Sequence, residues 1–294
     1  MLEFGRLGLG TAPLGGLYEA VDDETAHAVV ERAWELGIRY FDTAPYYGSG
    51  SAERRLGGVL CERPREEFVL STKVGRLLHP GESDWHGAPP LRAYFDFSYD
   101  ATLRSLEESL ERLGLDRVDI ALIHDPDDHY DEALAGSYPA LARLRDEGVV
   151  RAIGVGMNQT ELLCRFALET DPDCFLVAGR YTLLDRRAAE QLLPLCVARG
   201  IAVVAGGVFN SGVLAGGRTY DYDSASPAVL ERVAELREIC ARREVPLAAA
   251  AVQFPVRHPA VERVLVGCRT AHEVEEDVRL FELDLTPELW RELA

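Results

Sequence analysis

The sequence predicts an α/β protein in which eight parallel strands, each followed by a helix, close into a single-domain (β/α)8 TIM barrel. Two observations lead to this prediction. Apolar, β-rich segments alternate with segments of helical periodicity along the whole chain, and strict alternation favours parallel strands. The length of 294 residues also suits one barrel of roughly 250 residues with a few longer loops. We therefore treat residues 1–294 as one domain.

The expected strands are short apolar runs bounded by glycine, proline or polar residues. In chain order they cover 8–10, 39–41, 68–72, 118–123, 152–155, 175–178, 201–205 and 263–266. Eight such units favour a closed barrel over an open, doubly wound sheet. The active site is then expected at the C-terminal mouth of the strands, where the loops that follow them meet.

Helices are expected where apolar residues recur at spacings of three and four. The clearest stripes are Leu103, Leu106, Leu110 and Leu113; Ala189, Leu192, Leu193, Cys196 and Val197; and Val229, Val233, Leu236 and Cys240. Ser226-Pro227 predicts a helix start, with a capping serine and a proline in the first turn. Residues 158–161 and 270–273 have the spacing of capping boxes, led by Asn158 and Thr270.

Two polar segments are too long to be plain connections. Residues 79–97 follow the third expected strand, and residues 206–225 follow the seventh. Because the loops after the strands carry the chemistry of a barrel, both are expected to contact substrate or cofactor.

Composition narrows the classes of partner. A net charge of −18 at pH 7 would repel nucleic acid and anionic membranes, and no apolar run reaches the roughly 18 residues of a membrane span. The first residues do not resemble a secretory signal, so a cytoplasmic enzyme with a small neutral substrate is expected, as a monomer or a small homo-oligomer. The cysteines form no C-x-x-C pair and are expected to be reduced and mostly buried; they are Cys61, Cys164, Cys174, Cys196, Cys240 and Cys268.

Lys73 is the only lysine among 31 basic residues. A codon bias toward arginine explains the excess of arginine. Such a bias would spare a lysine where a guanidinium cannot replace a compact ammonium. Lys73 is therefore a candidate functional residue.

Polar residues at three expected strand ends suggest a task for this lysine. Asp42, Lys73 and His124 end the second, third and fourth strands, and Tyr47 lies in the loop after Asp42. A tyrosine with a pKa near ~10 needs a nearby cation to act as a base at neutral pH. Lys73 can supply that charge, Asp42 can hold Lys73, and His124 can donate a hydrogen bond to the reacting oxygen.

Each residue also has a simpler explanation. Asp42 could cap a turn, Tyr46 could replace Tyr47, and His124 could be a buried histidine of the core. A metal site using His124 with Asp125, Asp127 and His129 is a further alternative, disfavoured by the short spacing around Pro126.

The chain resembles the aldo-keto reductase superfamily over nearly its whole length. The resemblance rests on segments 41–53 (FDTAPYYGSGSAE), 70–75 (LSTKVG), 117–127 (RVDIALIHDPD) and 148–158 (GVVRAIGVGMN). It implies a catalytic tetrad of Asp42, Tyr47, Lys73 and His124, with Tyr47 as general acid in reduction and general base in oxidation. It also implies a nicotinamide dinucleotide at the barrel mouth without a Rossmann fold, which agrees with the missing G-x-G-x-x-G after the first strand.

The resemblance further implies where that dinucleotide binds. Asn158 is expected at the carboxamide, Tyr181 against the nicotinamide ring, and the segment around Phe209 over the pyrophosphate. The expected cofactor-binding set is Gly10, Thr11, Asp42, Asn158, Tyr181, Phe209, Asn210, Ser211, Gly212, Leu214, Gly267, Cys268, Arg269, Thr270, Glu273, Glu276 and Asp277. The sequence departs from the family pattern at Met157 and Ala178, where serine and glutamine are common.

Within the superfamily, segments 178–185 (AGRYTLLD) and 124–129 (HDPDDH) resemble the branch that contains L-fucose dehydrogenase, D-threo-aldose 1-dehydrogenase and pyridoxal 4-dehydrogenase. This resemblance implies oxidation of an aldose at C1 to the lactone. A general aldehyde, ketone or pyridoxal oxidoreductase and a non-catalytic dinucleotide-binding regulatory subunit remain alternatives.

Charge favours NAD over NADP as the cofactor. Glu273 stands where NADP-dependent members place a basic residue, and a carboxylate would repel the 2′-phosphate. Arg269 could still bind that phosphate, and Glu273 could simply be part of the capping box. For the substrate, Trp85 is expected to form an apolar wall, and Asp127, with Asp128 and His129, to bind hydroxyls, alongside Tyr47 and His124.

Overall fold

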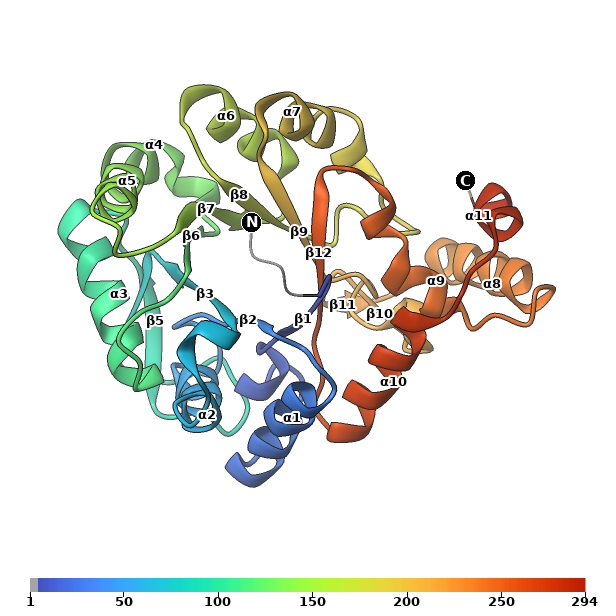
Figure 1. Cartoon of the computed structure of the whole chain (residues 1–294), viewed down its shortest axis with the longest axis horizontal. Helices are drawn as coiled ribbons and strands as arrows, with labels where there is room; N and C mark the ends of the chain where they lie inside the picture. The colour runs from blue at the N-terminus through green and yellow to red at the C-terminus, as the bar shows by residue number, and fades with distance from the viewer. Residues whose placement is uncertain (1–4, 294) are drawn as a thin grey trace.

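The computed structural model describes residues 5–293 and confirms the closed barrel (Figure 1). Its eight strands lie in the order β1-β12-β9-β8-β7-β6-β3-β2, and every neighbouring pair is parallel. The barrel strands are β1 (Leu7–Gly10), β2 (Tyr40–Asp42), β3 (Val69–Val74), β6 (Ile120–His124), β7 (Ala152–Met157), β8 (Cys174–Ala178), β9 (Ala202–Gly206) and β12 (Val261–Val266). All eight expected strands are present, with each end within two residues of its prediction.

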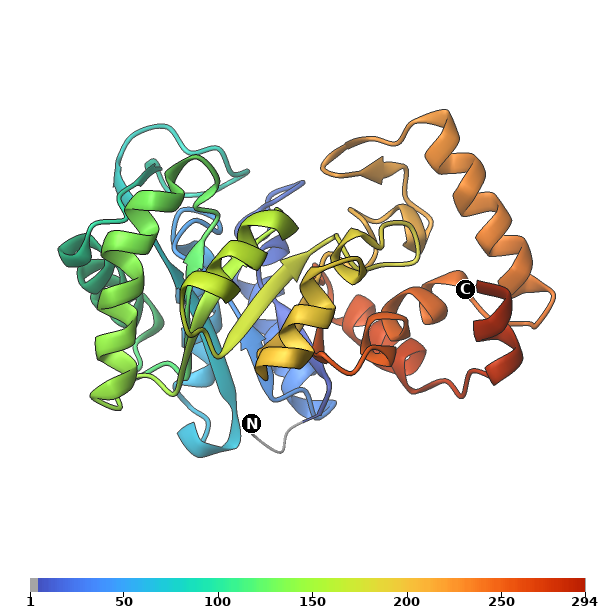
Figure 2. The same cartoon turned by 90° about the horizontal axis from the view of Figure 1, so that it is seen from above.

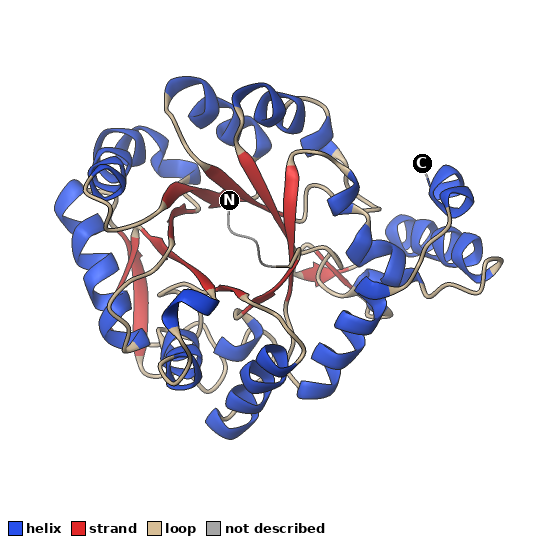
Figure 3. Ribbon diagram, in the orientation of Figure 1, coloured by secondary structure: helices blue, strands red, loops and turns tan. Residues whose placement is uncertain are grey.

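Helices surround the barrel as an outer ring (Figure 3). They are α1 (Asp23–Glu35), α2 (Ser51–Leu60), α3 (Tyr99–Leu113), α4 (Tyr130–Glu132), α5 (Tyr138–Asp146), α6 (Thr160–Glu169), α7 (Leu192–Arg199), α8 (Pro227–Ala241), α9 (Leu247–Gln253), α10 (Ala271–Glu282) and α11 (Pro287–Leu293). The expected stripes lie on α3, α7 and α8. Two residues of the stripe on α7 deviate, because Ala189 precedes the helix and Val197 is half exposed.

The predicted helix starts are confirmed in two of three cases. Ser226 accepts a hydrogen bond from the Val229 amide at the start of α8, and Thr270 accepts one from the Glu273 amide at the start of α10. The expected capping box led by Asn158 is wrong. Strand β7 continues to Met157, so α6 starts later, after Gln159, without a side-chain cap.

Side chains alternate between the inside and the outside of the barrel. Tyr40, Val69 and Leu122 belong to the inner cluster, whereas Phe41 and Leu70 belong to the larger cluster between strands and helices. This alternation directs Asp42, Lys73 and His124 inward, because each lies an even number of residues beyond an inner side chain of its own strand. The strands thus bring the three polar groups to one end of a packed apolar interior.

Each of the two long polar segments, which were expected to be functional loops, contains a hairpin. After β3 the chain forms β4 (Arg76–Pro80) and β5 (Leu91–Phe95), and after β9 it forms β10 (Thr219–Tyr220) and β11 (Asp223–Ser224). The backbone amide of His86, between β4 and β5, donates to the carbonyl of Gly16 after β1. Figure 2 shows the second hairpin projecting from the barrel near the N-terminal end of α8.

The cysteines of the described residues are free thiols. Four are buried, Cys164 is half-buried and Cys61 is exposed, which agrees with the expectation that most of them are buried. Within residues 5–293, no helix is long and apolar enough to cross a bilayer.

Glycine at position 154 is required by the parallel register of β7 and β8. Gly154 lies opposite Cys174, and a Cβ at Gly154 would lie 1.7 Å from the Cys174 carbonyl oxygen. A Cβ at Gly156, two residues along the same strand, would meet its neighbours at 3.5 Å or more. A side chain at position 154 therefore forces the backbone to move, whereas one at position 156 does not.

We therefore expect Gly154→Ala to lower the free energy of unfolding by about 3 kcal/mol or more, since the barrel must open locally. Gly156→Ala is the matched control and is expected to cost less than about 1 kcal/mol. Urea unfolding of both variants measures the difference. Equal midpoints would contradict the steric account.

Candidate active site

A buried ion pair joins β2 to β3 at the top of the barrel interior. Lys73 Nζ donates to Asp42 Oδ1 at 2.6 Å and to the carbonyl oxygen of Thr43 at 2.9 Å. Ser71 Oγ donates to the other oxygen of Asp42 at 2.6 Å. The side chains of Lys73 and Asp42 are only 2% and 3% exposed, so these bonds replace almost all of their hydration.

The environment keeps Lys73 charged. Burial lowers the pKa of Lys73, but the charges of Asp42 and Tyr47 and the hydrogen bond to Asp42 more than offset this, so the pKa lies above its ordinary value. An ammonium therefore persists inside the barrel across the physiological pH range.

Tyr47 lies against this ammonium. Lys73 Nζ is 4.6 Å from the centroid of the Tyr47 ring, and the ring also contacts His124 and Trp85, at centroid distances of 5.7 and 5.8 Å. Burial raises the pKa of Tyr47, and Lys73 only partly offsets the increase. Lys73 thus favours the phenolate, but desolvation of the phenolate is the larger effect and sets the net direction of the shift in the pKa.

His124 ends β6 with its side chain inside the barrel. Burial, reinforced by the positive charges of Arg76 and Lys73, lowers the pKa of His124 well below its ordinary value, so the imidazole is neutral. Its Nδ1 is buried and has no hydrogen-bond partner among the described residues. A neutral imidazole can donate one N–H to a reacting oxygen without adding charge.

Tyr46, the alternative to Tyr47, has a different environment. The guanidinium of Arg76 lies 4.4 Å from the centroid of the Tyr46 ring, and Trp85 meets that ring edge-on at 5.1 Å. Tyr46 thus packs against an arginine, whereas Tyr47 packs against Lys73. Trp85 is 8% exposed and contacts both tyrosines, so it lies beside the predicted site as expected for a substrate wall.

The acidic segment after His124 does not assemble a metal site. Asp125 pairs with Arg76 at 2.5 Å, and His129 pairs with Glu132 at 3.1 Å and packs against Phe95. Across residues 5–293, no group of three or more His, Cys, Asp or Glu side chains could hold a metal ion. Asp127 is half-buried at the start of a short 3-10 turn.

The predicted pyrophosphate segment has an unusual backbone. Asn210, Ser211 and Gly212 all have positive φ, at 47°, 59° and 97°. Asn210 Nδ2 donates to the Gly179 carbonyl at 3.3 Å, while its Oδ1 is buried without a partner among the described residues. The amides of Asn210 and Gly212 donate to the carbonyls of Gly207 and Phe209, at 2.9 and 3.0 Å, so this segment is a tight turn held by its own backbone.

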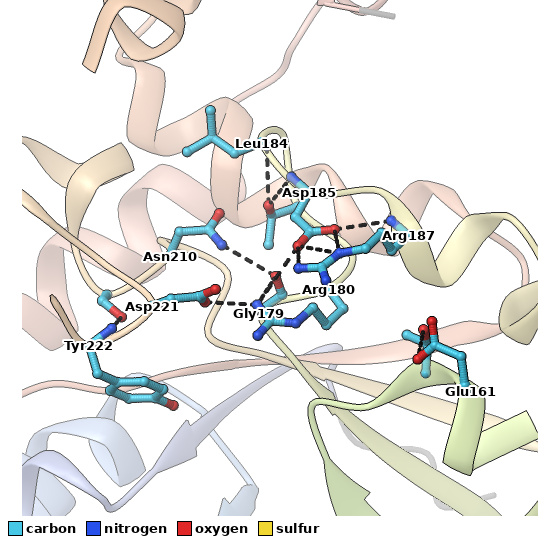
Figure 4. A network of polar contacts seen from close by, with 12 residues as sticks. Glu161, Gly179, Arg180, Leu184, Asp185, Arg187, Asn210, Asp221 and Tyr222 are labelled. Carbon is cyan, nitrogen blue, oxygen red and sulfur yellow. Dashed lines mark hydrogen bonds and ion pairs between the residues drawn. The ribbon is translucent and has the colours of Figure 1, made fainter. Parts of the chain in front are cut away.

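Figure 4 shows that this segment is tied to two other parts of the mouth. Ser211 Oγ accepts from the Tyr222 amide at 3.0 Å in the β10–β11 hairpin. Arg180 donates to Asp221 in the same hairpin at 2.7 Å and lies 3.7 Å from Asp185. Position and orientation of the predicted pyrophosphate segment therefore depend on contacts between three loops.

The remaining predicted cofactor residues lie at other strand ends. Gly10 and Thr11 end and follow β1, Asn158 follows β7, and Gly267 follows β12. Thr11 Oγ1 is buried without a partner among the described residues. Tyr181 packs one side of its ring against Phe254, with centroids 5.0 Å apart, and is 9% exposed.

At the predicted adenosine end, arginine and carboxylates neutralise one another. Arg269 pairs with Glu19 at 2.6 Å and with Glu273 at 3.3 Å, and Glu273 also accepts from the Arg269 amide at 2.7 Å.

The other residues predicted to bind the cofactor differ in exposure. Leu214 is buried, Phe209 is half-buried, and Glu276 is exposed on α10. The Cys268 side chain is buried and its thiol lies 3.4 Å from a carboxylate oxygen of Asp277. Burial raises the pKa of Asp277 to about 7.

Sequence reasoning missed two residues of the site. Arg76, which begins β4, was not singled out, and Asp125 was considered only as a possible metal ligand and not as the partner of Arg76. Asp125 follows His124 with a φ of 43°, which no sequence pattern marks. The stacking of Arg76 on Tyr46 also needs the β4–β5 hairpin, which was not predicted from the sequence.

With this geometry in place, the comparisons with known proteins identify the family. A model of the Aldo/keto reductase family matches residues 6–294. The chain belongs to this family, and it is an oxidoreductase of the aldo-keto reductase type. Enzymes of this family use NAD(P)H.

Relatives of known activity are similar over almost the whole chain. A D-threo-aldose 1-dehydrogenase from a Pseudomonas species is 44% identical over 98% of this chain and 92% of its own length. A pyridoxal 4-dehydrogenase from Microbacterium luteolum is 42% identical, with the same coverages of 98% and 92%. Among solved structures, the holo form of an aldo-keto reductase from Bacillus halodurans has a TM-score of 0.82 at 27% identity, covering 100% of this chain and 93% of that one.

The residues at the mouth fit a dinucleotide. Buried oxygen atoms of Thr11, Thr43 and Asn210 have no partner among the described residues, although buried polar groups are normally hydrogen-bonded. Thr11 and Thr43 directly follow β1 and β2, and Asn210 lies in the turn with positive φ angles. These three groups provide hydrogen-bonding capacity where a bound molecule could use it.

The ion pair between Lys73 and Asp42 gives a stability prediction. Lys73→Met leaves the Asp42 carboxylate buried without a counter-charge, so we expect the free energy of unfolding to fall by about 3–5 kcal/mol. Adding Asp42→Asn to that variant removes the orphaned charge and should recover about 2 kcal/mol. Urea unfolding of the four proteins of this double-mutant cycle at pH 7 measures the coupling. Additive costs would show that the pair contributes no mutual stabilisation.

Proposed function

We propose that this protein is an NAD-dependent aldose 1-dehydrogenase, which oxidises the C1 hydroxyl of a sugar to the lactone. The observation that carries the proposal is the contact of Tyr47 with the buried Lys73 and with neutral His124 at one end of the barrel. The name of the relative at 44% identity supports this substrate class. The relative at 42% identity supports pyridoxal as a second candidate substrate.

The side chains supply the proton chemistry of this reaction. Tyr47 takes the proton of the C1 hydroxyl in oxidation and returns it in reduction. Lys73 stabilises the phenolate that forms, and Asp42 holds Lys73 through the bond at 2.6 Å. His124 donates a hydrogen bond to the oxygen whose charge changes. The dinucleotide, when bound, accepts the hydride from C1.

The raised pKa of Tyr47 has a consequence for direction. A protonated phenol is ready to act as a general acid, so the free protein is prepared for reduction at neutral pH. In oxidation the phenolate must form beside Lys73, so the rate of oxidation should rise with pH until Tyr47 is deprotonated. Lys73 remains charged over that range, because its own pKa is raised.

The cofactor is proposed to bind across the strand ends. Thr11, Asn158 and Asn210 are assigned to its polar groups, Tyr181 to the nicotinamide ring, and Ser211 and Gly212 to the pyrophosphate.

The sugar is proposed to bind beside the tyrosines. Trp85, beside Tyr46 and Tyr47, provides the apolar wall for one face of the sugar. Asp127 is assigned to a sugar hydroxyl.

Tyr47→Phe tests the assignment of the acid and base. Loss of the phenol oxygen should lower kcat at least about a hundredfold, because it removes the group that exchanges the proton in the proposed mechanism. Dinucleotide affinity measured by fluorescence titration should stay within about threefold. Tyr46→Phe is the control, since this neighbouring ring contacts Arg76, and it should retain most of the turnover. Similar losses in the two variants would refute the role of Tyr47.

A substrate screen tests the activity itself. Initial rates with L-fucose, D-threo aldoses, other aldoses and pyridoxal are measured with NAD and with NADP. Turnover of an aldose with release of the lactone supports the proposal, and turnover of pyridoxal alone selects the second candidate. Dinucleotide binding without turnover of any substrate would instead identify a regulatory subunit.

The preference for NAD is proposed to arise from Glu19 and Glu273, which neutralise Arg269. In Glu19→Gln/Glu273→Gln the guanidinium loses both counter-charges, so its positive charge becomes available to a 2′-phosphate. The kcat/KM for NADP should then rise about tenfold relative to that for NAD. Glu275→Gln, which removes a carboxylate of the same helix that pairs with Arg32, should leave the ratio unchanged. A ratio that moves equally in both variants would reflect net charge alone.

A further inference from the structure

The backbone of Asp125 lies in the left-handed region. It directly follows His124 with a φ of 43°, and its amide still donates to the Gly156 carbonyl at 3.0 Å. The left-handed region is unfavourable for residues with a side chain, and it persists where the surrounding structure imposes it. The turn brings the Asp125 carboxylate back beside the histidine that precedes it.

That carboxylate is fixed between two groups. Its Oδ2 lies 2.5 Å from Arg76 Nη2 and 3.5 Å from His124 Nε2. Arg76 is itself held, because its guanidinium lies 4.4 Å from the centroid of Tyr46 and 4.8 Å from that of Phe95. The side chains of Arg76 and Asp125 are only 14% and 29% exposed. The carboxylate therefore has little freedom to rotate away from His124.

The contact with Nε2 affects which nitrogen of His124 carries the proton. Neutral imidazole has one N–H, and the other nitrogen presents a lone pair. A carboxylate attracts an N–H and repels a lone pair, so Asp125 favours the proton on Nε2. Nδ1, on the other side of the ring, has no partner among the described residues that would favour the alternative.

The distance also matters for catalysis. At 3.5 Å, the contact between His124 Nε2 and Asp125 is longer than a hydrogen bond. It can therefore bias the tautomer without occupying the N–H, which stays available to a substrate oxygen. The other charged groups near the imidazole are Arg76 and Lys73, and neither cation attracts an N–H.

We propose that Asp125, clamped by Arg76, is a positioning residue that keeps the proton of neutral His124 on Nε2. The catalytic consequence rests on the proposed function, in which His124 donates to the reacting oxygen. The tautomer itself is a property of the free protein. It can be measured whether or not the substrate has been identified.

The first experiment measures the tautomer directly. Long-range ¹H–¹⁵N correlation spectra of the ¹⁵N-histidine-labelled protein distinguish an Nε2–H from an Nδ1–H imidazole, and His124→Asn assigns the signals. Nε2–H is expected in the wild type, with a mixture or Nδ1–H in Asp125→Gly. An Nδ1–H imidazole in the wild type, or an unchanged tautomer in Asp125→Gly, would overturn the proposal.

The second experiment separates positioning from direct contact with a sugar. In Asp125→Gly, kcat for reduction of 4-nitrobenzaldehyde, which has no hydroxyl groups, should fall about tenfold with little change in KM. A loss confined to aldoses would show that Asp125 binds a sugar hydroxyl, and would overturn the positioning role. If the wild type reduces no aldehyde and oxidises no aldose, the proposed function fails, and the spectra still decide the tautomer.

Two further variants guard against effects on folding. Glu244→Gly relieves another positive φ, 57°, at an exposed position after α8, and is the control for backbone strain. Glu244→Gly should raise Tm slightly, whereas Asp125→Gly relieves the same kind of strain but also leaves the guanidinium of Arg76 without its partner, so its Tm should not rise. Only Asp125→Gly should alter the tautomer and kcat. Asp125→Asn tolerates the left-handed conformation and keeps an acceptor oxygen, so it should rescue part of kcat. Failure of this rescue together with a wild-type tautomer would contradict the proposal.

Discussion

The buried ion pair between Lys73 and Asp42 is the interaction on which the site depends. Removing two charges from water costs several kcal/mol for each, and this cost is offset only where partners are close and well oriented. Here Asp42 receives both Lys73 and Ser71, and Lys73 also reaches the Thr43 carbonyl. These bonds lock β2 to β3 and hold an ammonium against Tyr47. A guanidinium is larger and planar, which explains why a chain with so much arginine keeps one lysine here.

The barrel below the ion pair is built to support it. Large and small residues complement one another across the interior: a Cβ at Gly8 would lie 2.7 Å from the Tyr40 ring, and the Tyr40 hydroxyl bonds Ser71 at 3.1 Å. Ser71 in turn bonds Asp42, so the polar layer rests on the packed layer beneath it. Rigid strands then hold the groups at the mouth in one arrangement, which is what proton transfer in a defined geometry requires.

Loops distant in sequence meet at the mouth through paired charges. Arg76 with Asp125, Arg180 with Asp221 and Arg269 with Glu19 each join two separate connections. The net charge of −18 therefore does not leave the mouth uniformly negative. These pairs organise the predicted positions for the imidazole, the pyrophosphate and the adenosine. Because partly exposed pairs are modest in energy, we attribute to them orientation of the loops more than stability of the barrel.

The sequence by itself determined the barrel, its strands, and the placement of Asp42, Lys73 and His124 at one end, because alternation and strand ends are local patterns that the fold must obey. Only the tertiary structure decided the later start of α6, the two hairpins, the pairing of Arg76 with Asp125, and the choice of Tyr47 over Tyr46 as the neighbour of Lys73. It also decided that desolvation outweighs the effect of Lys73 on the pKa of Tyr47. These features depend on contacts between remote segments and on desolvation, and both come into existence only when the barrel closes.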